Sequence, residues 1–174
     1  MKIRTTALLV CAGAAGFVAL HAQQQAPSVA ASAKRSYTGI KNNFIKAAEK
    51  MPEENYSFKP ADALETFGGR VAHIANPQLG TCTGLTGERK QGAAKATMSK
   101  AELVAAIKES FDACDKAFDA LTDANALETV AAGRGQQPRI SVLYGLIVHA
   151  NEVYGAMGVY MRLKGIVPPS SEGR

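Results

Sequence analysis

The stretch SKAELVAAIKESFDACDKAFDAL, residues 99–121, has the clearest amphipathic pattern in the chain. Its apolar residues recur at three- and four-residue spacing, on one face of an α-helix: Leu103, Ile107, Phe111, Cys114, Phe118 and Leu121. The helix also has a defined start, because the Ser99 hydroxyl and the Glu102 carboxylate suit the two halves of a capping box. This stretch therefore predicts an amphipathic helix whose apolar face must be covered by other elements.

Three other segments have a helical period, and none of the chain alternates as a strand does. The predicted helices cover residues 36–51, 66–87 and 138–165. The last has apolar residues on two neighbouring stripes, so we expect it to be buried on most sides. Residues 123–137 are expected to hold a turn of helix and a loop. Four helices with short to medium connections predict an all-α four-helix bundle.

The connector between the first two predicted helices, residues 53–65, shows neither helical nor strand periodicity. It holds Tyr56 and Phe58, two aromatic residues in a chain where aromatic residues make up only 6%. We expect both rings to anchor the connector against the bundle.

The N-terminus resembles a cleavable export signal. Lys2 and Arg4 precede an uncharged stretch from Thr5 to Leu20, and Ala22 is the small residue that a signal peptidase prefers. The stretch is shorter than the roughly 20 residues that span a bilayer, so we expect no stable membrane anchor after cleavage. The predicted organisation is a signal peptide at 1–22, a flexible leader at 23–35, the bundle at 36–167 and a tail at 168–174. The expected location is periplasmic or extracellular.

The charge of the chain argues against a nucleic-acid partner. The formal net charge is +5, and loss of Lys2 and Arg4 with the signal would leave 5 − 2 = +3. The remaining basic residues are dispersed among acidic ones, whereas a nucleic-acid surface clusters its Lys and Arg side chains.

Export also changes how the cysteines are interpreted. Cys11 would leave with the signal, which leaves Cys82 and Cys114 on consecutive predicted helices. An even number of cysteines in an oxidising compartment suits a disulfide. Two small buried thiols in a helical core are an equally good interpretation.

Several stretches, taken in order, resemble the DinB-like superfamily and in particular its exported members. They are FIKAAEKMP (44–52), YSFKP (56–60), TFG (66–68), HIA (73–75), HANEVYG (149–155) and YMRLKG (160–165). The resemblance implies a four-helix bundle, often a homodimer, with a divalent metal such as zinc or nickel. It also implies three histidine ligands, one on the second helix and two spaced four apart on the fourth. Some relatives are thiol-cofactor-dependent transferases or isomerases.

The ligand set implied by the resemblance is incomplete in this chain. His73 and His149 match the first two positions, but Val153 occupies the third. Glu152 lies three residues after His149 on the predicted helix and could supply a carboxylate in place of the missing imidazole. Alternatively, His73 and His149 are ordinary residues of a degenerate pocket, and Glu152 faces solvent.

Two functions follow from these alternatives. The chain is an exported bundle that has lost its catalytic site and serves as a binding or envelope protein, or it is a metal-dependent transferase or hydrolase that uses His73, His149 and Glu152. The missing third histidine favours the first.

Overall fold

A computed structural model describes residues 27–133 and 135–173 of the chain. The predicted signal peptide, residues 1–22, lies outside the described residues. Four long helices make up most of the structure, as the sequence predicts: α1 (Val29–Lys50), α2 (Phe67–Thr86), α3 (Lys100–Asp119) and α4 (Arg139–Leu163). Two short antiparallel strands precede α4, namely β1 (Thr129–Ala132) and β2 (Gly135–Pro138). Two 3₁₀ turns complete the set, η1 (Glu53–Asn55) and η2 (Pro169–Ser171).

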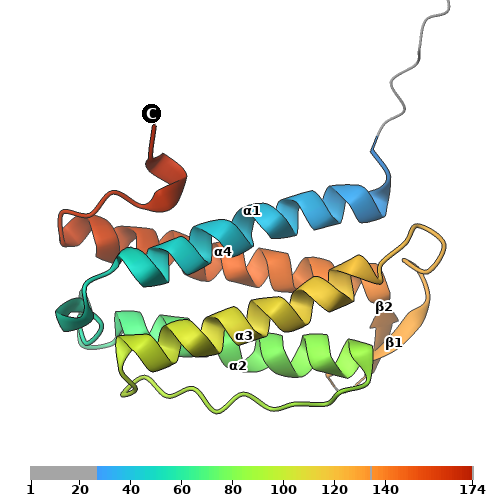
Figure 1. Cartoon of the computed structure of the whole chain (residues 1–174), viewed down its shortest axis with the longest axis horizontal. Helices are drawn as coiled ribbons and strands as arrows, with labels where there is room; N and C mark the ends of the chain where they lie inside the picture. The colour runs from blue at the N-terminus through green and yellow to red at the C-terminus, as the bar shows by residue number, and fades with distance from the viewer. Residues whose placement is uncertain (1–26, 134, 174) are drawn as a thin grey trace, which may run out of the picture.

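The four helices form two layers (Figure 1). In that view α1 lies in front of α4, and α3 lies in front of α2. Helix α2 packs on α3 and on α4, and α1 packs on the same two helices. The segment between Thr86 and Lys100 returns along the whole length of the bundle, so α2 and α3 run in the same direction. Helices α2 and α4 run in opposite directions.

The returning segment is fixed to α2 by side-chain hydrogen bonds. The Asn76 amide donates to the Ala94 carbonyl at 2.9 Å and accepts from the Ala94 N–H at 2.9 Å. The Thr83 hydroxyl accepts from the Lys90 N–H at 2.9 Å. Gly92 approaches so closely that a Cβ there would lie 2.4 Å from Asn76. The crossover is therefore part of the packed structure.

Among the described elements, the most extensive contact is the one between α2 and α3. Cys82 and Cys114 are joined by a disulfide across it, with their Cα atoms 4.9 Å apart. One turn away, the buried Gln78 amide donates to the Ser110 hydroxyl at 3.1 Å. Phe111 is fully buried in the same core.

The predicted helix boundaries agree with the structure where the sequence contains a capping residue. The capping box of Ser99 and Glu102 is present at the start of α3. Thr66 caps α2 by accepting from the Gly69 N–H at 3.0 Å. Gly87 ends α2 with φ of 86°, a left-handed conformation that glycine adopts without a steric penalty.

The first helix begins earlier than predicted. It starts at Val29 instead of Ser36, so the prediction of a flexible leader is wrong over residues 29–35. The Ser28 hydroxyl accepts from the Ala31 N–H and caps the helix. Alanine is the best helix former, and Ala33 packs into the core. The sequence before Tyr37 has too few large apolar residues to reveal these additional residues of helix.

Two further predictions need correction. Residues 123–137 were expected to hold a turn of helix and a loop, and Pro138 the first turn of the last helix, but residues 129–132 and 135–138 form the paired strands β1 and β2. The strands are four residues each; β2 is exposed throughout, and β1 alternates only between exposed and half-buried positions, which is too short a pattern to predict a strand. Helix α4 is also less enclosed than predicted, because one side carries four exposed apolar side chains: Tyr144, Val148, Val159 and Leu163.

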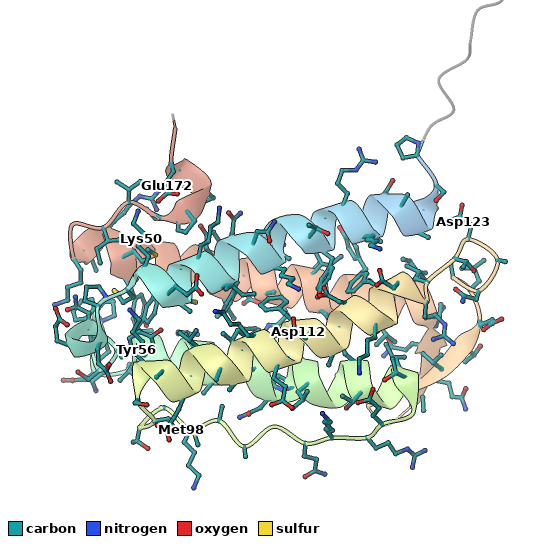
Figure 2. All side chains as sticks on the ribbon, viewed as in Figure 1. Lys50, Tyr56, Met98, Asp112, Asp123 and Glu172 are labelled. Atoms are coloured by element: carbon teal, nitrogen blue, oxygen red, sulfur yellow. A yellow bond between two sulfur atoms is a disulfide. The ribbon has the colours of Figure 1, made fainter. Side chains whose placement is uncertain are left out.

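The connector and the C-terminal segment close one end of the bundle. Tyr56 is buried and its hydroxyl donates to the Ala48 carbonyl, while the Phe58 ring packs edge-on against Tyr160 with centroids 6.0 Å apart. Both aromatic residues anchor the connector as predicted. Figure 2 shows Lys50, at the end of α1, beside Glu172 of the C-terminal segment, and the two form an ion pair. Among the described residues, no helix combines the length and the apolar character needed to cross a bilayer.

Candidate functional site

Helices α2 and α4 bring the two predicted histidines together. His73 lies in the first half of α2 and His149 near the middle of α4. Because the two helices are antiparallel, the imidazole rings meet with their centroids 5.0 Å apart and their planes inclined by 59°. Their side chains are 42% and 40% exposed. The pair therefore lies on the surface of the α2/α4 interface and is open to solvent.

Each histidine has a carboxylate near its Nδ1 atom. Glu152 Oε2 lies 3.6 Å from Nδ1 of His149, and Glu65 Oε1 lies 3.8 Å from Nδ1 of His73. Both separations exceed hydrogen-bonding distance but permit an ion pair when the imidazole is protonated. Metal-binding histidines commonly present one ring nitrogen to a carboxylate and the other to the metal. The arrangement at both rings is compatible with that orientation.

Glu65 was not identified from the sequence. It directly precedes the Thr66 cap, and its backbone carbonyl accepts a hydrogen bond from the Tyr160 hydroxyl of α4 at 2.8 Å. Its carboxylate also lies 3.5 Å from Arg70. A glutamate one residue before an N-cap carries no local sign of a long-range contact, so only the folded arrangement reveals its position beside His73.

The third position of the implied ligand set cannot supply a donor. Val153 has no donor atom and is only 4% exposed, packed within the core. The Glu152 side chain is 78% exposed. Within residues 27–133 and 135–173, no three His, Cys, Asp or Glu side chains are grouped closely enough to hold a metal ion. As placed in the described residues, the donors do not form a three-ligand metal site, and a carboxylate such as Glu152 would have to move to complete one.

Two hollows lie along α2, one beside His73 and one farther toward the β1–β2 hairpin. One, of about 420 Å³, borders His73 and is also lined by Lys59, Glu65 and Asn76. The other, of about 520 Å³, lies between the later half of α2, the start of α4 and the β1–β2 hairpin. The second hollow ends at Leu146, about one helical turn before His149.

These features define a class of helical protein, a four-helix bundle with a histidine pair at the contact of its second and fourth helices. Residues 37–155 match the family described as the DinB superfamily, and the chain belongs to that superfamily. The fold is similar to the crystal structure of a DinB-like protein from Bacillus cereus ATCC 10987, with a TM-score of 0.66. The two sequences are 22% identical, and the match covers 79% of this chain and 93% of that chain. No curated protein matches this sequence.

Proposed function

We propose that the chain is an exported DinB-superfamily bundle that keeps the position of a divalent metal site but has lost catalysis there. It would serve as a binding or envelope protein outside the cytoplasm. The observation that carries this proposal is Val153. This side chain occupies the implied third ligand position and is packed in the core, while the neighbouring Glu152 carboxylate extends into solvent.

Export is supported by two independent features of the chain. The sequence of residues 1–22 has the basic, apolar and small-residue regions of a cleavable signal. The Cys82–Cys114 disulfide is of a kind that persists in oxidising compartments and is rare in the cytoplasm. N-terminal sequencing of the secreted or periplasmic protein tests this part, and the expected first residue is Gln23. An unprocessed chain in the cytoplasm would contradict it.

The metal part is tested by isothermal titration of the purified protein with zinc and nickel. We expect no stoichiometric tight binding by the natural chain. The Val153→His variant restores an imidazole four residues after His149, on the same helix face, and is expected to bind zinc at one ion per chain. A Val153→Leu variant controls for repacking of the core. Stoichiometric tight zinc or nickel binding by the natural chain would contradict the loss of the site.

A second candidate function is a metal-dependent transferase or hydrolase that uses His73, His149 and a carboxylate. The closeness of the two rings and the carboxylate near each Nδ1 favour it. In this case zinc binding by the natural chain would weaken at least tenfold on replacement of either histidine by alanine. Glu152→Gln and Glu65→Gln would then show which carboxylate contributes. Equal zinc binding by all four variants would exclude this site.

A further inference from the structure

The hollow between α2, α4 and the hairpin exists because the two helices present glycines to it. Gly84 of α2 and Gly145 of α4 both line it, and a Cβ at either position would meet nothing within 4 Å. A third glycine, Gly80, lines it as well, and its nearest neighbour would be the Lys90 carbonyl at 3.6 Å. The disulfide fixes α2 to α3, and β1 and β2 pack against the start of α4. These contacts surround an open groove of about 520 Å³.

The lining of this groove has a definite chemical character. It contains no Asp or Glu, and its single charged side chain among the described residues is Arg89. The hydroxyls of Thr81 and Ser141 provide hydrogen bonds, and Val142 and Leu146 provide apolar surface. A groove of this kind favours a ligand with an apolar body and an acidic group.

Arg89 stands apart from the charged residues on either side of it. Glu88 pairs with Lys116, and Lys90 pairs with Glu109. No acidic side chain in the described part of the chain forms an ion pair with Arg89. Its φ of 50° makes it the single described residue other than glycine with a positive φ, a conformation that L-residues disfavour. Arg89 is therefore a cation that lines the groove, forms no ion pair with another described residue and has a backbone conformation that L-residues disfavour.

We propose that the groove binds a small organic anion, with its acidic group at Arg89 and its apolar body against Val142 and Leu146. The ligand would lie along α4 and point toward His149, which follows Leu146 by one turn. This inference goes beyond the proposed function, because it requires neither a metal nor the histidine pair. It assigns the binding capacity of the bundle to the hairpin end of the α2/α4 interface.

The test uses two fluorescent probes that differ in one group. 1-Anilinonaphthalene-8-sulfonate carries an acidic group on an apolar body, and N-phenyl-1-naphthylamine has the same ring system without it. We expect the natural chain to bind the sulfonate more tightly. Octanoate should displace it, whereas inorganic phosphate, which has no apolar body, should not. Displacement by phosphate alone would overturn the requirement for an apolar body.

Three variants locate the binding. Arg89→Gln removes the cation and should weaken sulfonate binding about tenfold, as expected for loss of one charge-assisted contact, with little change for the neutral probe. Gly145→Leu fills the groove and should abolish binding of both probes. Gly155→Leu is the matched control, since Gly155 is on the same helix, is exposed, lies outside the groove and also has no neighbour within 4 Å of a Cβ.

Circular dichroism verifies that each variant is folded, and Gly84→Leu fills the groove from α2 if the α4 variant does not fold. Unchanged binding by a folded filled variant would overturn the proposal. So would equal loss in Gly155→Leu or in Val148→Ser, because the probes would then bind the exposed apolar side of α4. If Arg89→Gln weakened the binding of both probes equally, the proposal that the ligand's acidic group lies at Arg89 would be overturned.

Discussion

Helix α2 presents one side to α3 and another to α4, and the two interfaces are built in opposite ways. Toward α3 and the crossover, a Cβ at Gly68 would lie 3.0 Å from Leu103 and 3.2 Å from the Ala96 carbonyl, so a side chain there would force its neighbours to shift. Toward α4, Gly84 faces open space. In α2, glycine therefore permits a close approach at one interface and leaves space unfilled at the other.

The difference sets a closely packed interface against an open one within a small bundle. The α2/α3 interface contains the disulfide, the Gln78–Ser110 hydrogen bond and fully buried Phe111. The α2/α4 interface carries the half-exposed histidine pair and the groove with Arg89. A rigid α2/α3 pair allows α4 to contact α2 sparingly without loss of the fold. Changes at the first interface should affect the free energy of unfolding, and changes at the second should affect binding.

The largest expected effect comes from the disulfide. A Cys82→Ser, Cys114→Ser double variant should lose about 3–4 kcal/mol of unfolding free energy, because the bond closes a loop with a sequence separation of 32 residues. Chemical denaturation of the natural and variant chains measures the loss. Reductant should destabilise the natural chain and leave the double variant unchanged. Equal stability of the two chains would show that the α2/α3 interface does not depend on the bond.

The two glycines of α2 provide a direct test of the contrast. Gly68→Ala should destabilise the bundle by about 1–3 kcal/mol, because the added methyl group overpacks against Leu103 and a backbone carbonyl. Gly84→Ala should stabilise it by about 0.5–1 kcal/mol, since alanine favours the helix and nothing obstructs the methyl group. Thermal unfolding of both variants measures the sign. The same sign at both positions would refute the distinction between the interfaces.

A smaller effect is expected where α3 begins. Ser99→Ala should cost about 1 kcal/mol, because it removes the side-chain acceptor for the Glu102 N–H. Ser99→Asp, which can also cap a helix, should retain most of the stability. Denaturant titration separates the two variants. A similar loss of stability in both variants would indicate that the helix cap itself contributes little to the free energy of unfolding.

The smallest effect concerns pH. Hydrogen bonds from the Ser99 hydroxyl and backbone N–H lower the pKa of Glu102 below its usual range. A lowered folded-state pKa means that this contribution is present above the ordinary pKa of glutamate and is lost as the pH falls through the lowered value. The stability difference between the natural chain and Glu102→Gln should therefore shrink on acidification. A difference that stays constant from neutral to acid pH would contradict the role of the charge.

The sequence specifies the helices where periodicity and caps coincide, and it says less about how they pair. The start of α3 follows from Ser99 and Glu102, and the end of α2 follows from Gly87. The beginning of α1 at Val29 and the β1–β2 hairpin were missed, because neither has a strong apolar period. The parallel arrangement of α2 and α3 depends on the long crossover, whose path has no local signature.

The candidate site was predictable in part. His73 and His149 were identified from the family resemblance, and the structure places their rings in contact. Glu65 and Arg89 were not identified from the sequence, because the residues they lie beside in the fold are not their neighbours in the chain. Glu65 reaches His73 through the fold of the connector, and Arg89 lines the groove three residues after α2 ends, at a positive φ.

The parallel pairing of α2 and α3 also has a consequence for how the chain folds. Neighbouring helices in an up-and-down bundle meet through short hairpins, whereas here Cys82 and Cys114 meet only after the crossover has closed. Closing a longer loop costs more chain entropy before any contact is gained, and folding rates fall as contacts become less local. We therefore expect the reduced chain to fold more slowly than an up-and-down bundle of equal length, and its thiols to pair after α2 has docked on α3.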